Sequence, residues 1–254
     1  NKDDYLHTLI ESYRIFASDR DNITFDYQGN DQNFLGIDDE YISDKVSFFD
    51  KNAAGKYNFP KPHGGGTAYM NAVDENGLGI SLIQSNFYGI GSRIGVGKYG
   101  FFLHNRGCGF NLIKGHPNSL GPNKKPLHTL SPTIWSKNGS LDFITGTRGG
   151  RYQPQLLAQT ILPYILGESS FEEIMKKPRW TIEYFGSNTS STINFEFIKE
   201  PEISSLEDKG HKISVEDKLI GGYGPISTIY KNSNEKFVGV PDIRVGTEKA
   251  FNNS

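Results

Sequence analysis

The stretch of the chain best suited to covalent chemistry is "GGGT", in which Gly64–Gly66 come directly before Thr67. A threonine hydroxyl is a weak nucleophile unless a base lies beside it, and the α-amine of a chain that begins with threonine supplies that base. Cutting the Gly66–Thr67 bond would create such an amine, and a small residue before the threonine leaves room for the attack. The same four residues also suit a flexible loop that leads into a strand, so the junction alone does not decide between the two.

Composition narrows the classes of function. The 27 Lys and Arg nearly balance the 29 Asp and Glu, which gives no indication of nucleic acid or an anionic membrane as partner. No apolar run approaches the roughly 20 residues that a membrane helix needs. The single cysteine, Cys108, excludes an internal disulfide and a cysteine-based metal cluster, and the six histidines form no ligand pair of the HExxH kind. We therefore expect no metal and no cofactor.

The chain starts with "NKDDYLHTLIESYRIFASDR", which has no initial Met and no signal peptide. Apolar residues recur at helical spacing, so an amphipathic helix is predicted over residues 1–20. A helix that is entered almost at once indicates a piece of a longer protein. The compartment stays open, with a slight preference for the cytoplasm.

Local patterns predict the elements that position Thr67. "TAYMNAVD" and "GLGISLIQS" flank the turn signal "ENG" and predict a β-hairpin that begins at Thr67. "SPTIWSKNGSLDFITG" predicts a second hairpin through Asn138-Gly139, and "GKYGFFLHN" a further strand. Helices are predicted for "DDEYISDKVSFF", "YQPQLLAQTILPYILGE", "SFEEIMKKPR" and "EISSLEDKG", and strands for "WTIEYFG", "STINFEFI", "HKISVED", "GPISTIYKN" and "EKFVGVPD". This order favours a layered α+β domain with two sheets stacked between helices.

Several motifs give almost the whole chain a resemblance to one family. "TAYMNAVDENGLGISLIQS", "GFFLHNRGCGF", "GPNKKPLHTLSPTI", "GTRGG" and "GVPDIRVG" resemble, in order and spacing, the small subunit of γ-glutamyltranspeptidases, which are N-terminal-nucleophile hydrolases. "YLHTLIESYRIFASDR" resembles the end of their large subunit. The resemblance implies a four-layer αββα sandwich, partial if the upstream half is absent. It also implies a self-cleaving precursor in which residues 1–66 end the large-subunit region and residues 67–254 form the small subunit.

The resemblance further implies which residues carry out acyl transfer. Thr67 would take an acyl group from an amide and pass it to water or an amine, with its own amine as base. Ser85 would orient that amine and assist the cut; otherwise it is an ordinary polar residue at a strand end. Gly149 and Gly150 would form the oxyanion hole, because two backbone N–H groups free of side chains can face a developing negative charge. The alternative for this glycine pair is a plain turn before a helix.

The positions that would hold the substrate depart from the family pattern. γ-Glutamyl enzymes bind the free α-amine and α-carboxylate of the substrate through polar groups. The matching substrate-binding positions here are Phe87, Asn105, Arg106, Gly109, His128 and Thr129. Because Gly109 stands where the family has an Asp, a buried substrate ammonium would be left unpaired, which is costly. The cations of Arg106 and His128 instead favour an acyl group that has a carboxylate and no nearby ammonium, such as glutaryl.

Other residues in these motifs allow a structural interpretation. Arg106 could equally pair with a neighbouring acid. Cys108, in the same loop, is more typical of a small buried side chain than of a second nucleophile. Asp242 and Arg244, in "GVPDIRVG", are predicted to form an ion pair that holds the fold.

The resulting interpretation is an enzyme, a γ-glutamyltransferase or amide hydrolase of the N-terminal-nucleophile type, made as a zymogen and connected to glutathione metabolism. Two alternatives stay open: true γ-glutamyl transfer through different contacts, and a non-catalytic relative that binds a small acidic ligand or a partner. The expected partners are a small acyl amide, such as glutathione or a glutaryl analogue, and a large-subunit polypeptide from the same precursor. A homo-oligomer is left open, and neither nucleic acid nor a membrane segment is expected.

Overall fold

The computed structural model describes residues 2–26, 37–57, 66–182, 192–246 and 249–251. Its α-helices are α1 (Lys2–Ile23), α2 (Asp39–Ser47), α3 (Gln153–Ile165), α4 (Phe171–Lys176) and α5 (Glu200–Asp208). Its strands are β1 (Thr67–Val73), β2 (Gly79–Ser85), β3 (Gly95–Val96), β4 (Phe101–Phe102), β5 (Thr133–Lys137), β6 (Ser140–Thr147), β7 (Trp180–Ile182), β8 (Thr192–Glu196), β9 (Lys212–Glu216), β10 (Ile226–Lys231) and β11 (Phe237–Val240). Within these ranges, no helix has both the length and the apolar character that crossing a bilayer requires. Nor do three His, Cys, Asp or Glu side chains of the same ranges gather as metal ligands.

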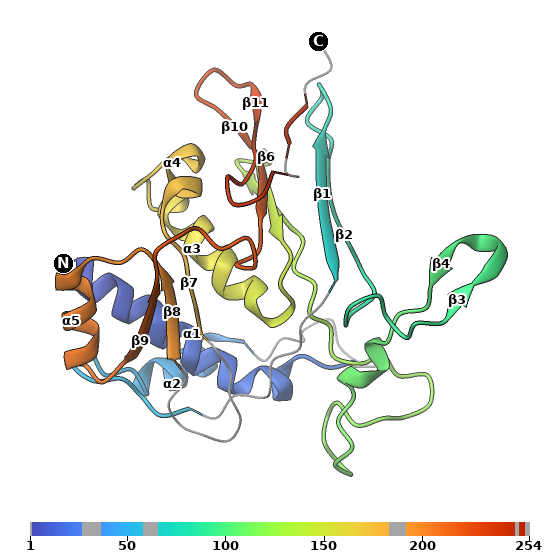
Figure 1. Cartoon of the computed structure of the whole chain (residues 1–254), viewed down its shortest axis with the longest axis horizontal. Coiled ribbons are helices and arrows are strands. Elements are labelled where there is room, and N and C mark those ends of the chain that lie inside the picture. The colour runs from blue at the N-terminus through green and yellow to red at the C-terminus, as the bar shows by residue number, and fades with distance from the viewer. Residues whose placement is uncertain (1, 27–36, 58–65, 183–191, 247–248, 252–254) are drawn as a thin grey trace.

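A four-stranded antiparallel sheet, in the order β11-β10-β6-β5, forms the middle layer of the larger part of the molecule. Helices α3 and α4 cover one face of this sheet, and the β1–β2 hairpin lies against the other (Figure 1). The core between helices and sheet includes Phe143, Leu156, Phe171 and Ile226, all essentially inaccessible to solvent. Burial of such side chains is the main force that holds the layers together.

Two glycines allow the hairpin to lie close to the sheet. The ring of Tyr69 on β1 occupies the place that a Cβ atom on Gly146 of β6 would need. A Cβ atom on Gly79 of β2 would lie only 2.5 Å from Cδ1 of Ile144. Since real Cβ atoms do not approach other atoms so closely, a larger residue at either position would have to displace these side chains, and the two glycines allow the start of β1 to lie against the end of β6.

The outer face of the hairpin is apolar. Side chains alternate along β1 and β2, and Met70, Ile80 and Leu82 point away from the sheet with exposed fractions of 52%, 53% and 45%. Met70 and Leu82 are direct cross-strand partners, so these side chains form one continuous surface. A contiguous apolar surface of this kind is typical of a face that another element covers.

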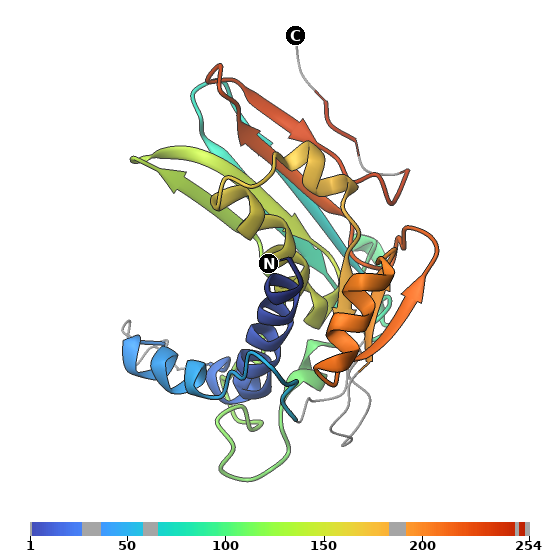
Figure 2. The same cartoon turned by 90° about the vertical axis from the view of Figure 1, so that its left-hand side faces the viewer.

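A second core joins the N-terminal helix to the C-terminal part of the chain. Strands β7 and β8 are antiparallel, whereas β8 and β9 are parallel and are connected through α5. Helix α1 runs beside α5 (Figure 2). Its Leu9 and Ile10 pack in one cluster with Ile182, Ile193 and Leu206. Segments on both sides of the Gly66–Thr67 bond therefore share one hydrophobic core.

A buried ionic network closes the C-terminal part. Arg244 Nη1 lies 3.3 Å from Asp242 Oδ1, which confirms the predicted ion pair, and Arg244 Nε donates to Glu196 Oε1 over 2.8 Å. Arg179 Nη1 lies 2.6 Å from Asp242 Oδ2 and donates to the Gly224 carbonyl over 2.9 Å. Burial lowers the pKa of Arg179 to about 10, although the carboxylate of Asp242 opposes this shift. All four charged side chains are buried.

The predicted helices and both hairpins are confirmed. Gly77 and Gly139 adopt the positive φ that their turns require, and Ser170 and Glu173 form a capping box at the start of α4. The predicted strand "GKYGFFLHN" is much shorter, because a 3-10 turn at Gly97–Tyr99 precedes β4 in a hairpin that extends from the body (Figure 1). The predicted strand "WTIEYFG" is seen as β7, and its end lies outside the described residues.

Candidate active site

The β1–β2 hairpin brings two hydroxyl groups to the Gly66–Thr67 bond. Thr67 begins β1 and Ser85 ends β2, and the antiparallel register makes them direct cross-strand partners. Thr67 Oγ1 donates to Ser85 Oγ over 2.9 Å. Ser85 Oγ accepts the Phe87 N–H over 3.1 Å and donates to the Gly66 carbonyl oxygen over 3.4 Å. Ser85 therefore connects the candidate nucleophile with the carbonyl group that it would attack.

Gly66 lies against the loop that follows β2. A Cβ atom on Gly66 would lie 2.5 Å from the carbonyl oxygen of Gly89, so a larger residue would require a backbone shift. The loop is sharply bent, because Phe87 and Arg93 have φ values of 78° and 65°, and Gly89 and Gly91 also have positive φ. Non-glycine residues rarely adopt this conformation, and such strain is concentrated at functional sites.

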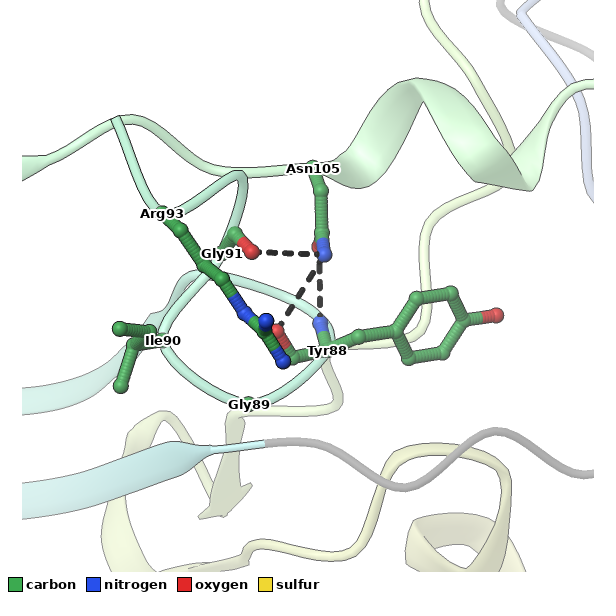
Figure 3. Close-up of a pocket in the computed structure, with 6 residues that line it drawn as sticks. All are labelled: Tyr88, Gly89, Ile90, Gly91, Arg93 and Asn105. Carbon is green, nitrogen blue, oxygen red and sulfur yellow. Dashed lines mark hydrogen bonds between the residues drawn. The ribbon is translucent and has the colours of Figure 1, made fainter.

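Asn105 holds this loop in place (Figure 3). Its Oδ1 accepts the Tyr88 N–H over 2.9 Å, and its Nδ2 donates to the carbonyls of Tyr88 and Gly91 over 3.3 and 3.0 Å. The loop and Asn105 line an open pocket of about 590 Å³, and the side chain of Arg93 lies along it. The structure thus shows Asn105 as a loop anchor, and its predicted contact with substrate stays a prediction.

The predicted oxyanion loop follows the end of β6. Gly149 and Gly150 have φ values of 124° and 56°, which favour glycine at both positions. Thr147 Oγ1 donates to the Pro225 carbonyl over 3.0 Å and fixes the start of the loop. Because the Tyr69 ring covers Gly146, the loop leaves the sheet at the end of the hairpin where β1 begins. The role of the two N–H groups stays a prediction.

Arg106 is a buried cation without a carboxylate partner among the described residues. Only 9% of the residue is exposed, and its Nη1 donates to Thr129 Oγ1 over 3.2 Å. Its guanidinium carbon lies 4.8 Å from the centre of the Phe87 ring. Its Nη2 is buried and has no hydrogen-bond partner in the described part of the chain. Burial lowers the pKa of Arg106, although Tyr88 opposes this shift.

The absence of an acid from the described surroundings of Arg106 has a physical meaning. A buried charge that is only partly hydrogen-bonded is costly, and a nitrogen without a partner adds to that cost. The alternative in which Arg106 pairs with a neighbouring acid is not seen within the described ranges. The arrangement can instead accept an anionic group from outside the chain.

Three further predicted binding residues lie around this cation or on the same loops. Thr129 is buried and binds Arg106 directly, whereas the neighbouring His128 is exposed. Partial desolvation, followed by the charge of Arg106, lowers the pKa of His128, and a hydrogen bond with the Leu130 backbone opposes this shift. A Cβ atom on Gly109 would lie 3.3 Å from the Leu127 carbonyl oxygen, so backbone crowds the position where the resemblance expects an Asp.

The prediction that Cys108 is a small buried side chain is wrong, since its side chain is exposed. It lies in the 3-10 turn Arg106–Gly109, in which successive side chains point about 120° apart. With Arg106 directed inward, the residue two positions later faces a different side. Sequence reasoning also missed the contact of Gly89 with Gly66, because nothing in the local pattern connects two glycines separated by a hairpin.

Comparison with known proteins supports the resemblance. The family model described as Gamma-glutamyltranspeptidase matches residues 1–251. The chain belongs to this family. The family membership predicted from the sequence motifs is thereby confirmed. The geometry around Thr67 is that of a γ-glutamyltranspeptidase family member.

Individual relatives differ in what their names say they act on. A glutathione hydrolase-like YwrD proenzyme from Bacillus subtilis is 30% identical over 235 residues, which are 88% of this chain and 42% of the relative. An oxamate amidohydrolase proenzyme from Klebsiella pneumoniae is 32% identical over 189 residues, which are 72% of this chain and 36% of the relative. The chain thus spans less than half the length of these relatives.

Solved structures share the mixed helix and sheet fold. A cephalosporin acylase from Bacillus halodurans has a TM-score of 0.82 and 25% identity, and the match covers 99% of this chain and 46% of the other. A γ-glutamyltranspeptidase from Pseudomonas nitroreducens has a TM-score of 0.60 and 18% identity, and the match covers 73% of this chain and 99% of the other. The predicted α+β class is confirmed by these matches.

Proposed function

We propose that the protein is a self-cleaving acyl-transfer enzyme of the γ-glutamyltranspeptidase family with Thr67 as its nucleophile. The observation that carries the proposal is the hydrogen-bond sequence from Thr67 Oγ1 to Ser85 Oγ and from Ser85 Oγ to the Gly66 carbonyl oxygen. A loop that merely enters a strand has no need for a second hydroxyl at this carbonyl. Family membership and the proenzyme names of the relatives support the same chemistry.

The first reaction is the cut itself. Thr67 Oγ attacks the Gly66 carbonyl carbon, the C–N bond breaks, and the Thr67 nitrogen takes up the proton, which leaves Gly66 as an ester on the threonine. Water then hydrolyses the ester and frees the carboxylate of Gly66 and the hydroxyl of Thr67, whose amine was already released when the C–N bond broke. Ser85 assists because its hydroxyl polarises the Gly66 carbonyl and holds the Thr67 hydroxyl beside it.

The second reaction acts on the substrate. The free Thr67 amine takes the proton of its own hydroxyl, the Thr67 oxygen attacks the acyl carbon of an amide, and the amine of the substrate leaves with that proton. Water or another amine then takes the acyl group from Thr67. The N–H groups of Gly149 and Gly150 stabilise the negative oxygen that forms in each step.

In this proposal the acyl group carries a carboxylate and no adjacent ammonium. The buried Nη2 of Arg106, the hydroxyl of Thr129 and the imidazole of His128 offer donors to a carboxylate. Gly109 offers no carboxylate to an ammonium, and the Leu127 carbonyl crowds its Cβ position. Glutaryl amides are therefore the first substrates to test, with the γ-glutamyl amide of glutathione as the comparison.

The proposal divides the chain at the cut. Residues 1–66 end the large subunit and residues 67–254 form the small subunit. These 188 of 254 residues are close to the 73% of the chain that covers 99% of the solved γ-glutamyltranspeptidase chain, which supports the division. The exposed apolar face with Met70, Ile80 and Leu82 offers a place for the rest of a large subunit, which would complete a four-layer αββα sandwich.

The intact mass of the complete precursor that contains this chain, taken under denaturing conditions, tests the proposal. We expect the wild type to give two species that divide between Gly66 and Thr67, and Thr67→Ala to give one. Ser85→Ala should slow the cut by about 100-fold, as expected for the loss of a hydroxyl that stabilises developing charge. An uncleaved wild type with no turnover of glutaryl or γ-glutamyl anilides would contradict the proposal and favour a non-catalytic binding protein.

A further inference from the structure

A polar network outside the active site holds the segment that precedes the cut. Residues 50–57 run past the turn between α5 and β9, where the Ala54 N–H donates to the Lys209 carbonyl over 2.6 Å. Lys209 Nζ donates in turn to the Lys51 carbonyl over 2.9 Å. The segment belongs to residues 1–66, whereas Lys209 lies after the cut. These bonds therefore join the two proposed pieces.

Helix α1 binds the same segment from the other side. Glu11 is buried, and its Oε2 accepts the Gly55 N–H over 2.8 Å and the Tyr57 hydroxyl over 3.3 Å. Its Oε1 accepts from Arg14 Nη1 over 3.0 Å. One carboxylate thus anchors two residues of the segment and is itself oriented by an arginine of the same helix.

Arg14, His211 and His7 form a hydrogen-bond chain in which the position of each proton is determined. Arginine can only donate, so the Arg14 Nη1 contact of 3.0 Å makes His211 Nδ1 an acceptor. His211 then carries its proton on Nε2 and donates to His7 Nδ1 over 2.8 Å. His7 carries its proton on Nε2 and donates to the Asp50 carbonyl over 2.8 Å. The chain, which we term the histidine relay, requires both imidazoles to be neutral.

The surroundings of the relay favour that neutral form. His7 and His211 are 1% and 4% exposed. Burial, followed by the charges of Arg14, His7 and Lys209, lowers the pKa of His211 to about 3. Glu11 Oε1 is 4.0 Å from His211 Nδ1, but Arg14 lies between them as the donor to both. The other facing groups are Tyr57 on the segment and Asp4, whose Oδ1 is 3.9 Å from Lys209 Nζ.

We propose that the histidine relay is a positioning device for self-cleavage: it fixes residues 50–57 between α1 and the α5–β9 turn and so sets how Gly66 is presented to Thr67. The inference rests on the proposed function. Arg14, His211 and His7 touch neither reacting atom, and they act through the Asp50 carbonyl. Protonation of either imidazole would place a donor against a donor and release the segment.

A matched pair of variants tests the relay in the complete precursor. His7→Leu removes both hydrogen bonds of the imidazole, whereas His7→Gln keeps an oxygen to accept from His211 and an N–H to donate to the Asp50 carbonyl. Thr8→Ala, an exposed position on the same helix, is the control. Hydrogen exchange of the Ala54 and Gly55 amides is followed in a Thr67→Ala background, and the rate of the cut is followed by mass in the Thr67 background.

We expect His7→Leu to accelerate exchange of these two amides and to slow the cut, each by about tenfold, since the part-buried Asp50 carbonyl loses its donor. His7→Gln and Thr8→Ala should stay within about threefold of the wild type, which is less than one buried hydrogen bond is worth. With the relay intact, both rates should change together only in acid, as His211 with its pKa of about 3 begins to take up a proton, well below the usual histidine pKa of about 6.5. If the relay were purely structural, the hydrogen-exchange rate of the two amides would change while the rate of cleavage stayed the same.

Several outcomes would overturn the inference. Faster exchange with an unchanged rate of cleavage would show that the relay stabilises the fold but does not position Gly66. Unchanged exchange in His7→Leu would show that other contacts hold the segment. If His7→Leu does not fold, the pH dependence of the wild type and the behaviour of His7→Gln decide. A wild type that never cleaves refutes the proposed function itself, whereas equal cleavage by wild type and His7→Leu refutes only the relay.

Discussion

Two of the regions of buried arginine in this protein, one around Arg179 and Arg244 and one around Arg106, differ in how their charges are satisfied. Arg179 and Arg244 lie among the carboxylates of Asp242 and Glu196 and several backbone carbonyls. Arg106 has a hydroxyl on one nitrogen and an aromatic ring on its face, and its other terminal nitrogen has no partner in the described ranges. In the first region the guanidinium groups are paired with carboxylates of the same chain. In the second region, among the described residues, Nη2 of Arg106 has a hydrogen bond still to make.

This difference separates a structural charge from a binding charge. Removing one member of a fully paired buried network leaves an uncompensated charge, and such losses are among the largest that a point mutation causes. Removing a cation that has no acidic partner strands no carboxylate. The fold should therefore tolerate loss of Arg106 and fail to tolerate loss of Arg244, whereas substrate binding should show the opposite order.

The largest effect is expected for Arg244→Met. This change strands the buried Glu196 and part of Asp242, and it should lower the free energy of unfolding by about 3–5 kcal/mol. Urea unfolding of the purified protein measures the loss, with the exposed Lys137→Met as the control. A loss below about 1 kcal/mol would show that the network is no more important than a surface ion pair.

Arg106→Met should have its effect on the substrate. Loss of a charged hydrogen bond to a carboxylate costs about 1.5–3 kcal/mol, so the KM for a glutaryl amide should rise by roughly 10- to 100-fold with little change in kcat. The free energy of unfolding should change by about 1 kcal/mol or less. Steady-state kinetics and urea unfolding of the same preparation test both parts. An unchanged KM with a strongly destabilised fold would place Arg106 beside Arg244 as a structural residue.

The smallest effect is a pH dependence from His128. Because its pKa lies below the usual value, His128 is neutral near pH 7 and gains a proton only as the pH falls. The added charge lies next to the Arg106 site, so the KM for a glutaryl amide should decrease by about two- to fivefold between pH 7 and pH 5.5, as for a partly exposed charge. His128→Asn should abolish this decrease. A KM that is constant with pH in the wild type would remove His128 from the binding site.

Local patterns were sufficient to predict much of the fold. The Asn-Gly signals predicted both hairpins, and "SFEEIMKKPR" predicted a helix with a capping box, because turn and cap geometry depends on residues close in sequence. The hairpin prediction also placed Thr67 at the start of a strand, which was the first step towards the candidate site. The strand predicted over "GKYGFFLHN" proved too long, since the 3-10 turn at Gly97–Tyr99 leaves only the short β4.

The remaining features depend on contacts between distant segments. His7 and His211 are 204 positions apart, and no pattern around either residue indicates the other. The loop anchored by Asn105 and the approach of Gly89 to Gly66 are likewise set by how the hairpin folds back. The sequence could predict Arg106 only as a candidate substrate-binding cation, and its burial and the Nη2 atom without a partner in the described ranges depend on the assembled fold.

One hydrophobic core contains residues from both sides of the proposed cut. Leu9 and Ile10 lie before it, and Ile182, Ile193 and Leu206 lie after it. In an intact chain this packing is an intramolecular event, and its stability is independent of how much protein is present. After a cut at Gly66–Thr67 the same contacts would hold two molecules together. The melting temperature of the mature protein would then rise with its concentration, and dilution would become a way to separate the pieces.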